Sequence, residues 1–312
     1  VTVVATATSD PGRQGANTLG DNPKTADPCA ALPTNTFLTY GQPFLDPEVL
    51  NFGTCVMTTT MADGTGQVQT VLDLVAPAEY QPRPTAAGEL GEVQRPPAQD
   101  NACVRRESLA DLNQVVVTTK PLDNVKQPGD LLCSISESVL TDLNRALVNG
   151  PFPRRTAQFD SRSLALVDAC ALLSDQEVNA ALSAPPPGGP VADFGRWGCS
   201  WDKGPKKIDL TFSREWPIEG DTDVEGDRTK IGNRNAVISP TTTTASNGGK
   251  VDECTVRIVH RNYTPRLPVL KGTPSDREEV VNLEVEDTAT TDTAALCRTA
   301  TTLAAAIVNR LP

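Results

Sequence analysis

Histidine and aromatic residues are scarce in this 312-residue sequence, which has one His and thirteen aromatic residues: seven Phe, three Trp and three Tyr. The single histidine, His260, is the only base available to a Ser-His-Asp or Cys-His catalytic site. It alternates with apolar residues in the segment 254–260, so we expect it on the exposed face of a strand. The sequence therefore predicts a protein that is not an enzyme.

Metal-binding patterns are also lacking. There is no Cys-x-x-Cys pair, and zinc sites without His need clustered Cys. The segment Asp221–Gly226 matches the first half of a calcium loop, but its twelfth position is Gly232 instead of a bidentate Glu, so an acidic, solvated loop is favoured. Asp193–Gly195 spells the magnesium motif of kinases without the Gly-rich loop, strand lysine or His-Arg-Asp sequence. We expect neither a metal nor a cofactor.

Positive charge is in short supply, with 28 Lys and Arg against 39 Asp and Glu and a net charge of −11. Nucleic-acid binding needs a basic surface, so we expect no nucleic-acid partner. Adsorption to anionic lipid is disfavoured for the same reason. No stretch approaches the roughly 18 apolar residues of a membrane span, so we expect no span in this chain. An anchor upstream of Val1 is left open.

Eight cysteines are present, and they fall four to each half of the sequence: Cys29, Cys55, Cys103 and Cys133, then Cys170, Cys199, Cys254 and Cys297. Their neighbours match in the same order: DPCA at 27–30 with DACA at 168–171, FGTC at 52–55 with WGC at 197–199, and LLC at 131–133 with ALC at 295–297. Matched landmarks in one order predict an internal repeat.

An even number of cysteines without metal-type spacing indicates disulfides, and disulfides indicate an oxidising compartment. We expect two bridges in each repeat and no free thiol. The favoured pairing joins the first cysteine of each set to the second and the third to the fourth. A nested pairing, in which the first joins the fourth, stays open.

The predicted organisation is a flexible leader over 1–23, a first repeat over 24–150, a linker over 151–163 and a second repeat over 164–312. Each repeat begins with a short helix, continues with alternating segments typical of antiparallel strands and ends with an amphipathic helix. The predicted fold is therefore α+β, with two tandem related domains that each contain an antiparallel sheet, an opening and a closing helix, and two disulfides.

The second repeat resembles a known family in a short pattern of residues: Asp168, Cys170, Leu173, Cys199 and Trp201. This pattern is similar to that of actinobacterial extracytoplasmic lipoproteins of uncharacterised function. The layout also resembles the sensor ectodomains of mycobacterial receptor Ser/Thr kinases, which carry two disulfides beneath a ligand cleft. The resemblance is best over 165–312 and weaker over 26–148. It implies a secreted or membrane-anchored protein of the cell envelope, at the outer face of the cytoplasmic membrane.

These features predict a non-catalytic sensor or ligand-binding module whose partner is a polar small molecule or an envelope protein. We expect Trp197 and Trp201 to be buried, and Arg214 and Trp216, at the end of a strand, to reach a groove between the two repeats. The alternative is a structural protein of cell-envelope assembly that binds partner proteins. A carboxylate-based hydrolase is the third hypothesis.

Overall fold

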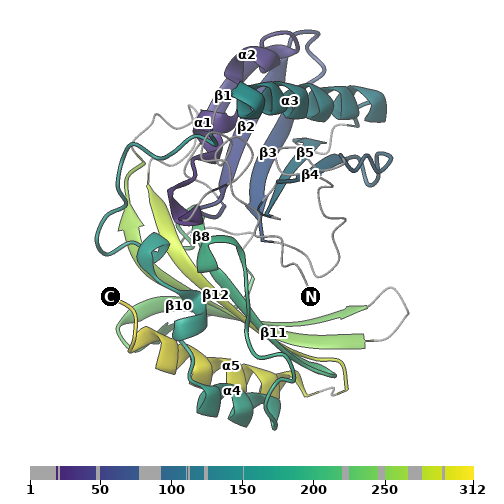
Figure 1. Ribbon diagram of the computed structural model, residues 1–312. Coiled ribbons are helices and arrows are strands. Elements are labelled where there is room, and N and C mark those ends of the chain that lie inside the picture. The colour runs from purple at the N-terminus through teal and green to yellow at the C-terminus, as the bar shows by residue number, and fades with distance from the viewer. Residues whose placement is uncertain are drawn as a thin grey trace, which may run out of the picture. The chain divides into compact units, whose positions relative to one another are not determined.

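The computed structural model describes residues 19, 22–46, 50–76, 93–109, 111, 113–122, 126–149, 151–219, 225–244, 250–265, 276–289 and 292–312. The chain forms two compact units (Figure 1). Unit 1 comprises Val1–Pro47 and Gly53–Thr156, and unit 2 comprises Glu48–Phe52 and Ala157–Pro312. The short segment at 48–52 is therefore part of unit 2, although both of its neighbours in the sequence belong to unit 1.

Unit 1 is a five-stranded antiparallel sheet in the order β1-β2-β3-β5-β4, with α3 packed on β4 and β5. Its elements are α1 (Pro28–Ala31), α2 (Thr34–Phe37), β1 (Gly41–Asp46), β2 (Thr54–Met61), β3 (Gln67–Val75), β4 (Cys103–Ser108), β5 (Gln114–Pro121) and α3 (Gly129–Asn149). The core lies between α3 and the sheet. There Leu140, Leu143 and Leu147 of α3 are each 1% exposed, as their shared helical face predicts.

Unit 2 is a seven-stranded antiparallel sheet in the order β6-β7-β8-β12-β11-β10-β9. Its elements are α4 (Asp175–Leu182), β6 (Val191–Ala192), β7 (Gly198–Lys203), β8 (Lys206–Glu215), β9 (Asp227–Ile231), β10 (Arg234–Thr244), β11 (Lys250–Tyr263), β12 (Arg277–Asp287) and α5 (Thr293–Val308). Helix α5 packs along β9, β10, β11 and β12, and α4 lies beside it on the same face of the sheet (Figure 1).

Local sequence explains how several of these elements begin and turn. Helix α4 starts with a capping box, in which Ser174 and Glu177 satisfy each other's backbone N–H groups. Asp27 and Asp168 accept backbone N–H groups at the start of the matching opening helices, so the same residue type caps both repeats. The β2–β3 hairpin turns at Gly64, whose φ of 75° is favourable for glycine.

Four disulfides are present, and each joins two cysteines of one unit: Cys29–Cys55, Cys103–Cys133, Cys170–Cys199 and Cys254–Cys297. The favoured pairing is confirmed, and none of the eight cysteines is free. In each unit one bridge ties the opening helix to an early strand, and the other ties a late strand to the closing helix. Such disulfides are typical of proteins that fold in an oxidising compartment outside the cytoplasm.

The two units share one strand order. The series β2-β3-β5-β4 in unit 1 corresponds to β7-β8-β12-β11 in unit 2, and equivalent disulfides lie at both ends of each series. In unit 2 the series continues to β10, which pairs with β11. In unit 1, Gln94 pairs with Arg106 of β4 at that place, as an isolated bridge. The predicted α+β fold with two tandem domains is therefore confirmed.

The segments predicted as leader and linker include ordered residues. Leu19 is fully buried, and its N–H donates to Asp111 Oδ2 at 2.6 Å. Residues 1–18, 20 and 21 of the predicted leader lie outside the described residues. The first part of 151–163 belongs to unit 1, where Arg154 pairs with Ala26, and the part from Ala157 onwards belongs to unit 2.

Candidate functional site

His260 is buried at 7% exposure, so the prediction of an exposed side chain was wrong. His260 is in phase with the fully buried Cys254, Val256 and Ile258, so strand alternation itself places it on the core-facing side of β11. A β-bulge shifts the pairing of β11 with β12 between Val259 and Arg261. Its Nε2 lies 2.7 Å from the Arg162 carbonyl oxygen. Burial lowers the pKa of His260, although this hydrogen bond opposes the shift.

Arg214 lies on the face of β8 that packs toward the core, at 4% exposure. Its Nη2 donates to the Asn51 carbonyl at 2.9 Å, and its guanidinium carbon lies 5.1 Å from the centre of the Phe52 ring. Its backbone N–H donates to the Leu50 carbonyl. Arg214 thus holds the segment 50–52 against the sheet of unit 2. A role in ligand binding stays a prediction.

Trp216 is half-buried, and the Arg277 guanidinium carbon lies 3.2 Å from its ring centre. Trp197 and Trp201 are 4% and 3% exposed, so their predicted burial is confirmed. The Trp197 Nε1–H donates to the Ala165 carbonyl at 2.9 Å, which satisfies its only polar group. The binding role predicted for Trp216 also stays a prediction.

A comparison of the two repeats identifies a different candidate, at the contact between the closing helix and the late strand. In unit 2 the core-facing residues of β11 after Cys254 are Val256 and Ile258, both fully buried. The equivalent residues of β4 in unit 1, counted from Cys103, are Arg105 and Glu107. The fold therefore accommodates apolar residues at both positions, and the charged pair of unit 1 needs a different explanation.

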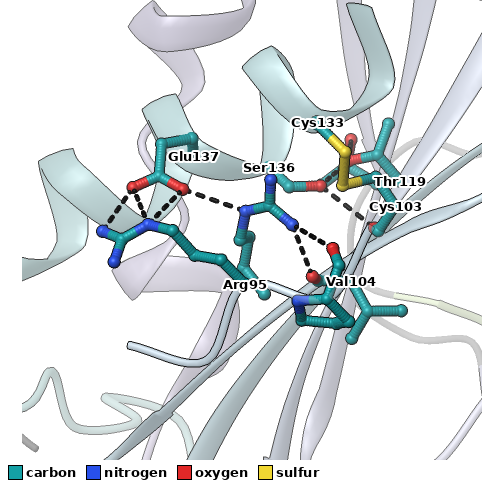
Figure 2. Close-up of a disulfide and its surroundings, with 10 residues drawn as sticks. Arg95, Cys103, Val104, Thr119, Cys133, Ser136 and Glu137 are labelled. Carbon is teal, nitrogen blue, oxygen red and sulfur yellow. Dashed lines mark hydrogen bonds and ion pairs between the residues drawn. A yellow bond between two sulfur atoms is a disulfide. The ribbon is translucent and has the colours of Figure 1, made fainter. Parts of the chain in front are cut away.

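Arg105 forms an ion pair across this contact. Its Nε donates to Glu137 Oε2 of α3 at 2.9 Å, and its Nη1 donates to the Pro96 carbonyl at 3.0 Å. Arg95 binds the same carboxylate through Nη2 at 2.8 Å and Nε at 3.1 Å (Figure 2). The Arg95 hydrogen bonds in particular lower the pKa of Glu137. One carboxylate thus ties two arginines together.

Next to this ion pair, Ser136 of α3 lies beside the Cys103–Cys133 disulfide (Figure 2). Its hydroxyl lies 2.8 Å from Thr119 Oγ1 and 3.2 Å from the Cys103 carbonyl oxygen. The disulfide and this hydroxyl fix the register of α3 on β4 and β5. The helix therefore presents Glu137 to the arginines from a rigid support.

Glu107 lies two residues beyond Arg105 on the same face of β4 and is 1% exposed. Its carboxylate forms no ion pair within the part of the chain that the structure describes, and the Asn144 side chain lies close to it. Burial raises the pKa of Glu107 to about 7, while the Asn144 side chain and the charge of Arg95 oppose the shift. The site can therefore hold a proton near neutral pH.

Residues 93–99, which we call the strap, run beside β4. The Gln94 N–H donates to the Arg106 carbonyl at 2.8 Å, and the Arg106 N–H donates back at 3.3 Å. A hollow of about 460 Å³ lies between the strap and the outer face of β4, lined by Gln94, Arg95, Pro96, Pro97, Gln99, Ala102, Val104 and Arg106. The Arg106 side chain is exposed and forms no ion pair within the described residues.

Sequence reasoning missed this site, although a signal was present. Aligning the two repeats on Cys103 and Cys254 places Arg105 opposite Val256 and Glu107 opposite Ile258. That exchange of apolar for charged residues could have been read from the sequence. The contribution of Arg95 could not, because it depends on how the strap folds back along β4.

Within the described part of the chain, no group of three or more His, Cys, Asp or Glu side chains is placed to hold a metal ion. Most of the predicted acidic loop at Asp221–Gly226 lies outside the described residues. Among the helices that the structure describes, none combines the length and apolar character that a membrane span requires.

No family model matches the chain, and no curated protein matches it. Among solved structures, the chain is weakly similar to DynU16, a protein of the dynemicin biosynthetic locus, with 11% identity and a TM-score of 0.15. The match covers 89% of this chain and 93% of that one. A similarity of this size carries no argument about fold or function.

Proposed function

We propose that the chain is a non-catalytic, extracytoplasmic ligand-binding module, and that the hollow between the strap and β4 receives an anionic group of a polar small molecule. The observation that carries this proposal is the difference between the repeats. Unit 1 has charged residues where unit 2 has Val256 and Ile258. Buried charged groups cost folding free energy, so a protein that keeps them in only one of two equivalent domains uses them for more than folding.

The chemistry of the hollow supports an anionic ligand. Arg106 offers an exposed guanidinium fork, which suits carboxylate or phosphate groups. The amides of Gln94 and Gln99 line the same hollow and can donate to further oxygens. Glu137 forms ion pairs with both Arg95 and Arg105, whereas Arg106 is exposed and forms none within the described residues, so Arg106 is the cation best placed to face a ligand.

A non-catalytic role is supported by the state of the residues that hydrolases most often use. The only histidine is buried against the Arg162 carbonyl, and all eight cysteines form disulfides. The disulfides also support a location outside the cytoplasm. In keeping with the resemblance described above, we propose a lipoprotein or a receptor ectodomain of an actinobacterial cell envelope.

The proposal is tested by titrating the ¹⁵N-labelled protein with citrate, inorganic phosphate and glucuronate, with glucose as the uncharged probe. We expect at least one anion to shift the amide resonances of Gln94 and Arg106, and glucose to shift neither. Arg106→Gln should weaken that binding about tenfold, because a charge-assisted bond is lost.

The matched control is Arg145→Gln, which removes an exposed arginine of α3 outside the hollow and should leave the binding unchanged. If no anion shifts the strap or β4 resonances, the proposed site is wrong. If an envelope protein fragment shifts them instead, the chain fits the assembly role.

A further inference from the structure

We propose that Glu107 is a pH-responsive latch: its protonated carboxyl keeps the strap closed on β4 and α3, and its ionised carboxylate loosens the strap. This inference concerns regulation of the hollow and rests on the proposed function for its significance. The geometry that carries it is the position of Glu107. This residue is 1% exposed and lies on β4, the edge strand of the unit 1 sheet, next to the residues that hold the strap.

The carboxyl lies where an ionised group is poorly accommodated. Glu107 forms no ion pair among the described residues, and the Asn144 side chain beside it offsets only part of the effect of burial on its pKa. A protonated carboxyl carries a donor of its own and has no net charge. A carboxylate in the same place must find a cation or water, because burial strongly disfavours an unpaired charge.

Charged groups reach Glu107 from three elements. Arg95 of the strap lowers its pKa and Glu137 of α3 raises it, while Arg105 lies two residues away on the same face of β4. On β5 the residue paired with Glu107 is Val115, which is 1% exposed and has no charge. Ionisation of Glu107 therefore adds a second carboxylate to a site where Glu137 already binds both arginines.

Two outcomes are available to the ionised group, and each breaks a contact that holds the strap in its closed position. Arg95 can leave Glu137 for Glu107, which breaks the ion pair that ties the strap to α3. Alternatively, water can reach Glu107, which requires the edge of β4 to open. In unit 2 the equivalent position is occupied by Ile258, so that contact holds no carboxyl that could ionise.

The pKa of about 7 places the transition near neutral pH. We expect the closed strap to dominate at pH 5.5 and the loosened strap to gain population as the pH rises to 8.5. The backbone bonds between Gln94 and Arg106 are the direct readout, since they hold the strap on β4. Their opening is measured by amide hydrogen exchange, corrected for the intrinsic pH dependence of exchange.

In the wild-type protein without ligand, the corrected exchange of these two amides should rise about tenfold to thirtyfold between pH 5.5 and 8.5. Glu107→Gln keeps the shape of the side chain but cannot ionise, so its exchange should stay flat over this range. Glu107→Ile, which copies unit 2, is the second neutral variant in case the amide variant does not fold.

The matched control is Glu253→Gln in unit 2, where the pKa of the carboxyl is also raised by burial. It should leave the pH dependence of the strap unchanged. The latch is overturned if wild-type exchange is flat, or if Glu107→Gln or Glu107→Ile keeps the wild-type rise. Because no ligand is added, this result is independent of the titration described above. A strap that responds to pH but binds no anion overturns the proposed function alone.

Discussion

Glu107 and His260 are buried titratable residues, one in each unit, and their pKa values are shifted in opposite directions. Burial raises the pKa of Glu107 and lowers that of His260, so both groups favour the neutral form in the folded state. Acidification therefore removes a penalty from unit 1 and adds one to unit 2. The two residues therefore change the stability of their units in opposite directions as the pH falls.

The first prediction concerns His260. Because its folded-state pKa lies below the unfolded value of 6.5, the unfolded chain binds a proton first as the pH falls. The corresponding stability is present above about pH 6.5 and is lost below it. All three tryptophans lie in unit 2, so urea unfolding followed by Trp fluorescence reports this loss. His260→Gln should show a smaller decrease between pH 7.5 and 5 than wild type. An unchanged decrease would assign it to other groups.

The second prediction concerns Arg214, whose guanidinium is buried and donates to the Asn51 carbonyl. Arg214→Ala leaves that carbonyl without its partner and removes the contact with Phe52, so unit 2 should lose about 1–3 kcal/mol of stability. The measurement is again urea unfolding followed by Trp fluorescence. Arg196→Ala, which breaks a more exposed ion pair with Asp168, should cost about 0–1 kcal/mol. Equal losses in the two variants would show that the Arg214 contacts do not stabilise the unit.

At the scale of elements, the sequence predicts most of what local chemistry determines. The capping box at Ser174 and the apolar face of α3 identify helices without a structure. The matched cysteines identify the repeat and the disulfides. Elements that depend on pairing between distant segments escape prediction. The bulge between Val259 and Arg261 results from the register of β11 on β12, and the bond between Gln94 and Arg106 depends on a chain that returns to β4.

The third prediction tests an element boundary. Ser174 accepts the Glu177 N–H at the start of α4, and the Glu177 side chain accepts the Ser174 N–H in return. Ser174→Ala should destabilise unit 2 by about 1 kcal/mol, because one backbone donor at the helix start loses its partner. Thr302→Ala, which changes an exposed residue of α5, is the control and should change stability by less than about 0.5 kcal/mol. Chemical denaturation of both variants distinguishes a capping effect from a general loss of hydroxyl groups.

At the scale of the whole molecule, the duplication is the feature that organises both fold and function. Each unit has its own sheet, closing helix and pair of disulfides, so each contains the requirements for a separate core. Because the two units share a strand order, residues that differ at equivalent positions are not required by the fold. Because both units fold around equivalent disulfides, the charged contact of unit 1 is a specialisation of one copy and not a requirement of the architecture.

The last prediction follows from this division. The Cys254–Cys297 bridge closes a sequence separation of 43 residues, and Cys103–Cys133 closes one of 30. In the chain-entropy model either bridge stabilises its unit by about 4 kcal/mol. Replacing Cys254 and Cys297 with Ala should shift the Trp-detected unfolding of unit 2 to lower urea concentration.

The matched change at Cys103 and Cys133 should leave that transition in place, because the bridge belongs to unit 1 and every tryptophan lies in unit 2. Circular dichroism, which reports both units, should show a destabilised transition in either double variant. If the unit 1 variant shifts the Trp-detected midpoint as much as the unit 2 variant does, the two domains unfold as one cooperative body. The two units would then share a topology but would not be independently stable.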